Sequence, residues 1–144
     1  MNLSAMTQPT KESDIKRKWH LIDVKDKTLG RIATEIALLL MGKGKPYFVR
    51  NLDCGDFVVI TNAKNIRVTG KKEVQKNYYR HSGYPGGFKS ETLKELRERK
   101  PEDVIKNAVK GMLPQNRLRD RMLKRLSIFA GEEHPYQERF KKSN

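Results

Sequence analysis

The sequence predicts an α/β fold built on a largely parallel sheet. Three observations support this prediction: a short apolar segment over residues 19–24, a helical apolar period over residues 29–40, and four consecutive apolar residues at 57–60. A continuous apolar run is typical of a strand covered on both faces, as the strands of parallel sheets are. Strand, helix and strand then form a βαβ unit, whose crossover should be right-handed.

Residues 28–42 carry the signals of one amphipathic helix. Thr28 stands at the N-cap position, and Gly42 follows the last apolar residue of the period. The apolar face comprises Leu29, Ile32, Ala33, Ile36, Ala37 and Leu40. The helix must bury this face against a neighbouring element, which the two predicted strands supply.

Two further strands are predicted from short apolar signals. Ile66 and Val68 alternate with polar residues and indicate a third strand that ends at Gly70. Residues 128–129, an isoleucine and a phenylalanine, indicate a last buried strand before a polar tail.

Helices are expected between the third and the last strand. Residues 90–106 carry nearly balanced charges, with Glu95 and Arg99 one helical turn apart, which is typical of a solvated helix surface. Pro101 suits the first turn of the next helix, which Pro114 should stop. The apolar line of that helix is Val104, Ile105, Ala108, Val109 and Met112.

A short helix is expected after Asn116, which can act as its cap. Leu118, Met122 and Leu126 would share its apolar face. Five cations occupy much of the remaining surface: Arg117, Arg119, Arg121, Lys124 and Arg125. They attract phosphate, but a merely solvated helix face is a serious alternative.

Length and composition indicate a single domain. A globule of 144 residues buries roughly 70% of its unfolded surface. We expect a flexible leader over residues 1–15, a single α/β domain over residues 16–131 and an extended tail over residues 132–144. The leader lacks the apolar core of a secretory signal and is interrupted by acidic residues, unlike organelle-targeting peptides.

Cysteine content and hydropathy exclude two further classes. Cys54 is the only cysteine, so an intrachain disulfide and a cysteine-rich metal site are excluded, which fits a reducing compartment. The most apolar run, residues 37–41, is far too short to cross a bilayer.

The charge of the chain points to a polyanionic partner. Lys and Arg number 31 against 17 Asp and Glu, giving a formal net charge of +14. Such an excess attracts polyanions and makes association sensitive to salt. Residues 67–89 concentrate six of these cations beside three tyrosines and a glycine-rich tip, with only Glu73 opposing them. Cations can meet phosphates, rings can stack on bases, and glycines let the backbone approach closely, so this segment indicates nucleic acid.

Other interpretations of these residues remain open at this point. The segment 67–89 could be a surface loop whose tyrosines pack and whose glycines turn the chain. Asp53 and Asp56 could form an acid/base pair of an RNA-modifying enzyme. However, an Asp-Cys-Gly-Asp turn that leads into a strand, as at residues 53–56, is common in loops without catalysis. The chain could also bind anionic membranes, but this segment is not a basic amphipathic helix.

Signals for a cofactor or a metal are weak. His20, His81 and His134 are scattered without ligand spacing. Residues 41–47 contain glycine and lysine but lack the spacing of a phosphate-binding loop, so Lys43 and Lys45 are better interpreted as cations at a helix C-terminus.

The sequence resembles the large-subunit ribosomal protein thirteen family of bacterial type, from residue 19 to residue 135. The matching motifs are Thr28-Leu29-Gly30-Arg31 with Ala33-Thr34, Gly42-Lys43 with Lys45, Asp53 with Gly55-Asp56, Asn62-Ala63, Thr69-Gly70-Lys71, Tyr79, the run from His81 to Gly87, the run from Val109 to Pro114, and Gly131 with Glu133-His134-Pro135. The chain departs from the family at Arg119, where a glycine is usual, and after Pro135.

The resemblance implies a three-layer α/β/α fold with a mostly parallel four-stranded sheet. It implies a non-enzymatic constituent of the large ribosomal subunit that binds rRNA and supports subunit assembly and translation. The expected partners are large-subunit rRNA and neighbouring large-subunit proteins, without cofactor, metal, membrane or small-molecule substrate. A cytoplasmic ribosome is favoured, although an organelle-encoded copy would look the same.

We expect residues 16–131 to form the rRNA-binding domain. Within it, the basic loop from Lys71 to Lys89 and the arginine-rich helix should carry most contacts, the lysines and arginines on phosphates and the rings on bases or sugars. The expected rRNA-binding residues are Lys43, Lys45, Lys71, Lys72, Lys76, Tyr79, Arg80, His81, Gly83, Tyr84, Gly86, Gly87, Lys89, Lys110, Arg117, Arg119, Arg121, Lys124 and Arg125.

Overall fold

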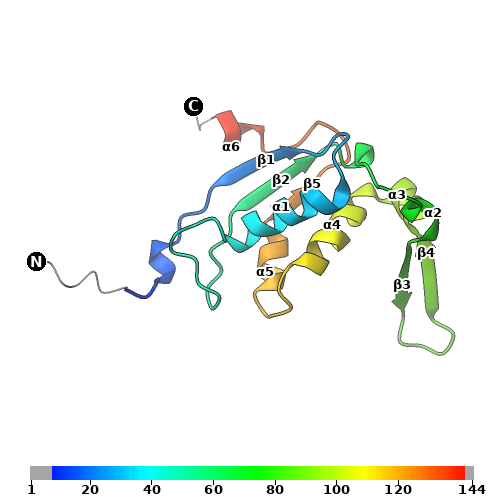
Figure 1. Cartoon of the computed structure of the whole chain (residues 1–144), viewed down its shortest axis with the longest axis horizontal. Helices are drawn as coiled ribbons and strands as arrows, with labels where there is room; N and C mark the ends of the chain where they lie inside the picture. Colours follow the sequence, from blue (N-terminus) through cyan, green and yellow to red (C-terminus); the bar gives the residue numbers. More distant parts are fainter. Residues whose placement is uncertain (1–7, 142–144) are drawn as a thin grey trace, which may run out of the picture.

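Three parallel strands form the central sheet of the computed structural model, which describes residues 8–141 (Figure 1). β1 (Trp19–Asp23) pairs with β2 (Phe57–Thr61), and β2 pairs with β5 (Leu126–Ile128). α1 (Leu29–Met41) connects β1 to β2. The predicted βαβ unit and the last strand are therefore confirmed, although β5 begins two residues earlier than predicted.

The strand predicted at Ile66 and Val68 is not formed. Arg67 makes a single parallel bridge, to Thr28, and its carbonyl accepts a hydrogen bond of 2.9 Å from the Leu29 N–H. A 3-10 turn, η2 (Ala63–Asn65), follows β2 and leads the chain to the start of α1 instead of along the sheet. Ile66 is buried in the core, which explains its apolar character. The sheet that the structure describes thus has three strands and not the expected four.

α1 and α4 (Pro101–Met112) pack against each other over one face of the sheet (Figure 1). α1 begins after Thr28 and ends at Gly42 as predicted, although the Thr28 side chain makes no capping hydrogen bond. α4 begins at Pro101 and ends before Pro114, also as predicted. The core between these helices and the sheet includes Ile22, Ile32, Ile36, Val58, Ile60, Val104, Ile105 and Val109.

The C-terminal segment covers the opposite face of the sheet beside β1 (Figure 1). The Trp19 ring stacks on Phe57, with centroids 4.5 Å apart, and lies 5.3 Å from the Tyr136 ring. α6 (Gln137–Lys141) adds Phe140, edge-on to Trp19 at 6.4 Å. The tail is therefore not extended over residues 137–141, because its aromatic side chains hold it on the apolar face of the sheet. Residues 142–144 lie outside the described part.

A two-stranded hairpin projects from one end of the body (Figure 1). β3 (Asn77–His81) pairs antiparallel with β4 (Phe88–Thr92), and α2 (Lys72–Gln75) precedes it. The basic segment was predicted as a loop. It forms strands because Tyr78 and its neighbours alternate between a face that packs on the body and a face that does not.

α3 (Leu93–Arg99) joins the hairpin to α4, and its Glu95 and Arg99, one helical turn apart, bind different partners. The Glu95 N–H donates to the Thr92 hydroxyl at 3.3 Å, and the Thr92 N–H donates to the Glu95 carboxylate at 2.9 Å. Glu95 thereby caps the helix. Arg99 instead binds Glu91 through two hydrogen bonds, of 3.0 and 2.8 Å.

α5 (Arg119–Lys124) precedes β5 and begins later than expected. The residue at its N-cap is Leu118, not Asn116. The Asn116 side chain accepts a hydrogen bond of 3.0 Å from the Leu118 N–H, so it shapes the turn before the helix.

In the leader, Glu12–Asp14 form a 3-10 turn, η1, while residues 1–7 lie outside the described part. No helix in residues 8–141 is long and apolar enough to span a membrane.

Candidate nucleic-acid interface

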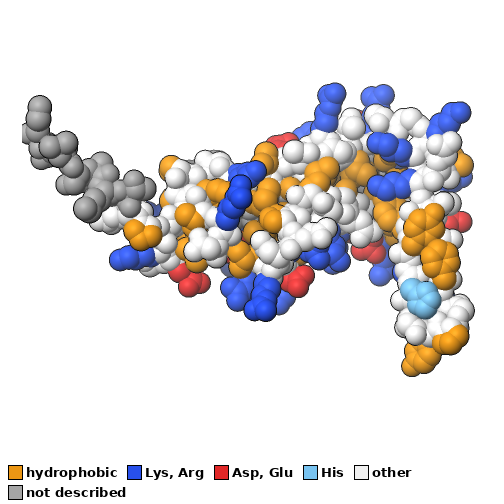
Figure 2. All heavy atoms as spheres, turned by 60° about the horizontal axis from the view of Figure 1, so that its bottom comes forward, with side chains coloured by type: hydrophobic (Ala, Val, Ile, Leu, Met, Phe, Trp, Pro, Cys, Tyr) orange, Lys and Arg blue, Asp and Glu red, His pale blue; other side chains and the backbone are white. Residues whose placement is uncertain are grey.

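One face of the β3–β4 hairpin carries an exposed pair of stacked aromatic rings. The register places Tyr79 opposite Ser90 and His81 opposite Phe88, so these four side chains share a face. The Tyr79 and Phe88 rings lie 5.6 Å apart at an interplanar angle of 21°. They are 66% and 61% exposed. Figure 2 shows hydrophobic side chains and a histidine in a row along the hairpin.

Phe88 was not among the predicted rRNA-binding residues. The signal that could have identified it is the register of the hairpin, which brings it beside Tyr79 although nine positions separate the two residues. Exposed rings of this size are unfavourable in water and are available to stack on bases.

The other face of the hairpin attaches it to the body. Tyr78 packs against the core, and burial raises the pKa of its hydroxyl, which has no hydrogen-bond partner in the described structure. The Lys76 ammonium lies 5.4 Å from the centre of the Tyr78 ring. Glu91 accepts the two hydrogen bonds from Arg99, which lower the pKa of its carboxyl. This face therefore fixes the direction in which the aromatic face points.

The tip of the hairpin is a tight turn that needs glycine. Gly83 and Gly86 adopt φ values of 86° and 72°, in the left-handed region that favours glycine. The Gly83 N–H donates to Nδ1 of His81 at 2.9 Å, which orients the imidazole. A Cβ on Gly87 would collide with the Ser82 hydroxyl. The three glycines thus have a conformational reason to be here, and Tyr84 between them is 76% exposed.

The cations around the hairpin have no acidic partner within residues 8–141. The side chains of Lys71, Lys72, Lys76, Arg80 and Lys89 are exposed, and none forms a salt bridge there. Glu73, the one opposing charge in this part of the sequence, binds Arg97 at 2.5 Å. Arg97 also donates to the carbonyls of Lys64 and Ile66. The segment's only acid is thereby occupied, and its cations remain free for a partner.

Arg125, in contrast, is buried inside the body. Its guanidinium forms a two-pronged ion pair with Asp53, in which one Nη2–Oδ1 distance is 2.6 Å. It also donates to the carbonyl of Asp56 at 3.2 Å and to that of Leu40 at 3.0 Å. Only 9% of the residue is exposed. Arg125 therefore binds the loop before β2 to the end of α1, and four of its five N–H donors are already used.

Lys45 is likewise committed to the fold. Its ammonium carries three N–H donors, and they meet the Lys16 carbonyl at 2.6 Å, the Cys54 carbonyl at 2.7 Å and the Asp56 carboxylate at 2.6 Å. The other Asp56 oxygen lies 2.8 Å from Nε2 of His20.

These contacts hold both aspartates within the fold, and they lower the pKa of Asp56. Burial alone would raise the pKa of Asp56, but hydrogen bonds from Lys45, from the Lys18 N–H and from His20 outweigh it and lower the pKa below the usual 3.8. Asp56 is thus a firmly ionised partner of cations, and Asp53 is held by Arg125. This arrangement accounts for both aspartates as parts of the fold and gives no support to an acid/base pair.

A second group of cations lies around α5. Arg117, Arg121 and Lys124 are exposed, whereas Arg119 is half-buried and its Nε has no hydrogen-bond partner in the described structure. Lys43 and Lys110 are exposed as well. The hairpin and α5 lie apart, and both project to the same side of the body (Figure 1). The predicted residues therefore do not form one cluster: most of the exposed ones lie around the hairpin or around α5, whereas Arg125 and Lys45 are paired within the body.

No group of three or more His, Cys, Asp or Glu side chains in residues 8–141 could hold a metal ion. The exposed side chains around the hairpin, unpaired within these residues, are cationic and aromatic, which is the combination that binds single-stranded or looped nucleic acid.

Comparison with known proteins gives a consistent result. The family model for ribosomal protein L13 matches residues 17–135. The large ribosomal subunit protein uL13 of Aquifex aeolicus is 57% identical over 131 residues, 91% of this chain and 91% of that protein. The uL13 proteins of Symbiobacterium thermophilum and Geobacter sulfurreducens are each 51% identical, over 94% and 91% of this chain and 93% and 92% of those proteins.

Proposed function

The chain belongs to the ribosomal protein L13 family, and on that premise we propose that its β3–β4 hairpin makes the principal contact with large-subunit rRNA. The protein is a structural, non-enzymatic constituent of the large ribosomal subunit, of the bacterial type. Its partners there are rRNA and neighbouring ribosomal proteins.

The observation that carries the proposal is the exposed Tyr79–Phe88 stack with free cations around it. An unstacked base can continue this pair of rings, because aromatic stacking accepts any base. Arg80 and Lys89 are paired across the hairpin on its other face, beside Tyr78 and Glu91, so they would bind phosphates of RNA that continues around the hairpin from that base. Tyr84 and the glycine turn extend the contact at the tip.

The α5 patch provides a second proposed contact. It comprises Arg117, Arg119, Arg121 and Lys124, while Lys43 and Lys110 of the predicted set are exposed outside this patch. We leave Arg125 and Lys45 out of the proposed interface, because nearly all of their donors are used inside the protein. Folded RNA brings phosphates of several helices together, and cations placed between them lower their repulsion. Two patches on one side of a rigid body would thus favour the assembled subunit in the cytoplasmic ribosome.

We also propose that the family's three-layer arrangement is completed by the C-terminal segment. α1 and α4 form one layer, the sheet the second, and residues 132–141 the third, over the aromatic cluster at Trp19. The bridge between Thr28 and Arg67 takes the place of a fourth strand. In this division, residues 16–131 form the rRNA-binding domain, and residues 1–15 remain a leader.

Crosslinking within intact large subunits tests the proposed interface. Subunits are irradiated with ultraviolet light, which crosslinks side chains to nucleobases in direct contact, and the crosslinked peptides and nucleotides are sequenced. Peptides from residues 77–92 should dominate, with Tyr79 or Phe88 as the modified residue. Crosslinks confined to the C-terminal segment and the Trp19 cluster would contradict the proposal.

A further inference from the structure

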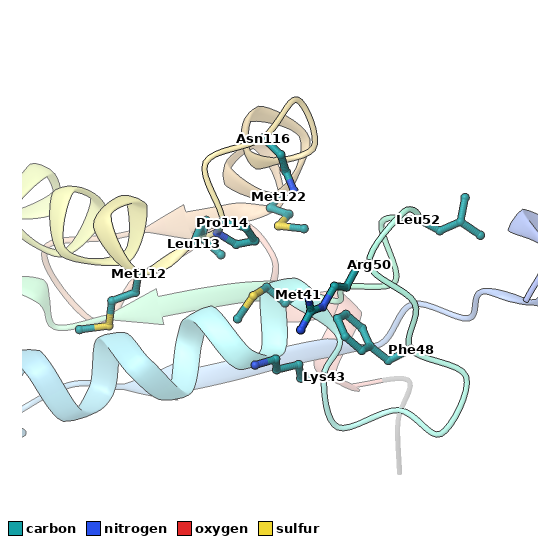
Figure 3. A pocket seen from close by; sticks show the side chains of 10 residues that line it. All are labelled: Met41, Lys43, Phe48, Arg50, Leu52, Met112, Leu113, Pro114, Asn116 and Met122. Carbon is teal, nitrogen blue, oxygen red and sulfur yellow. The ribbon is translucent and has the colours of Figure 1, made fainter.

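A cavity of about 370 Å³ lies between the end of α1, the loop before β2 and the link from α4 to α5 (Figure 3). Met41, Met112 and Met122 come from three different elements and meet around it, with Phe48 on the loop side. Thioether side chains adapt to flat ligands and contact ring edges favourably. The cavity belongs to neither cationic patch described above, although two family motifs, at Gly42-Lys43 and at residues 109–114, contribute to its wall.

The polar groups of the cavity are cations and one amide. Lys43 and Arg50 are exposed, belong to its lining and form no salt bridge within residues 8–141. Its lining contains no acidic side chain. Asn116 uses its Oδ1 to accept from the Leu118 N–H, which leaves its NH₂ group as a donor, directed toward Met122 in Figure 3.

We propose that this cavity holds one unstacked nucleobase of the rRNA, with the adjoining phosphates on Lys43 and Arg50. The inference rests on rRNA binding by this chain and adds a site separate from the hairpin. The volume falls within the range of about 300–1,000 Å³ found for small-ligand pockets, so one base fits. Apolar walls hold the face of a flipped base, and a donor such as the Asn116 amide can read a carbonyl or ring nitrogen on its edge.

Charge favours a nucleotide over an apolar side chain of a neighbouring protein. An apolar side chain would fill the cavity but would leave both cations at its wall without a counter-charge. A nucleotide brings its own anion beside its ring, so one ligand satisfies both the apolar wall and the cations.

A site-specific photocrosslink in assembled subunits tests this inference. Phe48 is replaced by a diazirine-bearing phenylalanine analogue, and large subunits carrying the variant are isolated and irradiated. The expected product joins residue 48 to one or two rRNA nucleotides. Adding Lys43→Ala and Arg50→Ala should lower its yield by about tenfold or more, the loss expected when a charge-assisted hydrogen bond to a phosphate is removed. Lys94→Ala with Lys106→Ala removes the same charge elsewhere and should leave the yield unchanged.

Two further measurements make each outcome decisive. Met112→Trp fills the cavity from an exposed position, so it should increase the dimethyl sulfate reactivity of the crosslinked nucleotide without preventing assembly. The same photoprobe at Tyr84 should crosslink to rRNA independently. RNA crosslinks at position 84 together with protein-only or intrachain crosslinks at position 48 would overturn the cavity inference and leave the hairpin proposal standing. An RNA crosslink at position 48 whose yield is unchanged by Lys43→Ala with Arg50→Ala would also overturn it.

Discussion

The body and the hairpin use the same cationic residue types in opposite ways. In the body, Arg125 and Lys45 are surrounded by Asp53, Asp56 and backbone carbonyls, and every donor of the Lys45 ammonium has an acceptor. On the hairpin, Arg80 and its neighbours are exposed without an acidic partner in the described structure. The net charge of +14 counts both groups alike. The difference teaches that cations available for RNA are those that no carboxylate of the fold has already neutralised.

The largest expected effect comes from breaking the buried pair. Arg125→Ala removes the two-pronged pair with buried Asp53 and leaves, among the described cations, only Arg17, 3.8 Å from its Oδ1, which should reduce the free energy of unfolding by about 3 kcal/mol, the lower end of the loss for a broken buried pair. Urea denaturation followed by circular dichroism measures this loss. The control, Arg121→Ala, changes an exposed arginine four positions before Arg125 and should stay within about 0.5 kcal/mol. Equal effects at the two positions would remove the distinction between body and surface cations.

Glycine substitutions extend the comparison to packing. A Cβ on Gly55 would overlap the Leu40 carbonyl oxygen and lie 2.6 Å from Nη2 of Arg125. Because backbone cannot move aside as a side chain can, Gly55→Ala should cost about 3 kcal/mol, the upper part of the over-packing range. Gly86→Ala, at the open hairpin tip, should cost about 1–2 kcal/mol through its left-handed backbone alone. Urea midpoints rank the two, and a larger cost at Gly86 would contradict this account.

Removing the hairpin rings should weaken RNA binding and spare the fold. Tyr79→Ala with Phe88→Ala should cost about 1–3 kcal/mol of affinity if one base stacks on the pair. The measurement is binding to large-subunit rRNA fragments at fixed salt. Thermal unfolding should be unchanged, since both rings are exposed and are not part of the core. A loss of stability without a loss of affinity would show that the rings serve the hairpin itself.

The smallest expected effect is the dependence of stability on acid. The pKa of Asp56 is lower in the folded protein than its usual 3.8. The ionised carboxylate therefore makes its full contribution to the free energy of unfolding at pH values above that usual pKa. This contribution is lost as the pH falls through the lowered folded pKa, because the unfolded state then binds the proton more readily. Unfolding free energies between neutral pH and pH 3 should therefore fall less steeply in Asp56→Asn than in the unmodified chain. An identical slope would mean that Asp56 does not contribute.

The sequence predicted the elements whose signals are local. The α1 period, Pro101 at the start of α4 and the apolar run of β2 all depend on neighbouring residues, and each is confirmed. The apolar alternation at Ile66 was misassigned to a strand because burial in a core requires no strand. The helix in the tail depends on distant aromatic residues at Trp19, which no local pattern records.

The candidate site shows the same limit. That the hairpin cations are unpaired could be predicted from composition, because Glu73 is the only acidic residue in residues 67–89. In the structure Glu73 binds Arg97. Arg125 and Lys45 could not be separated from them, because their partners lie far away in the sequence: Asp53 is 72 positions from Arg125. Phe88 was missed for a related reason, since its place beside Tyr79 depends on the register of two strands.

The salt dependence of rRNA binding tests the division between body and hairpin cations most directly. Each phosphate contact contributes about 0.7 to 0.9 to the slope of log K against log salt, so Lys71→Ala, Lys72→Ala and Arg80→Ala together should reduce the slope by about 2 to 3. The free energy of unfolding should stay unchanged, because all three side chains are exposed and unpaired in the described structure. An unchanged slope in a folded triple variant would contradict the assignment of the hairpin as the rRNA contact.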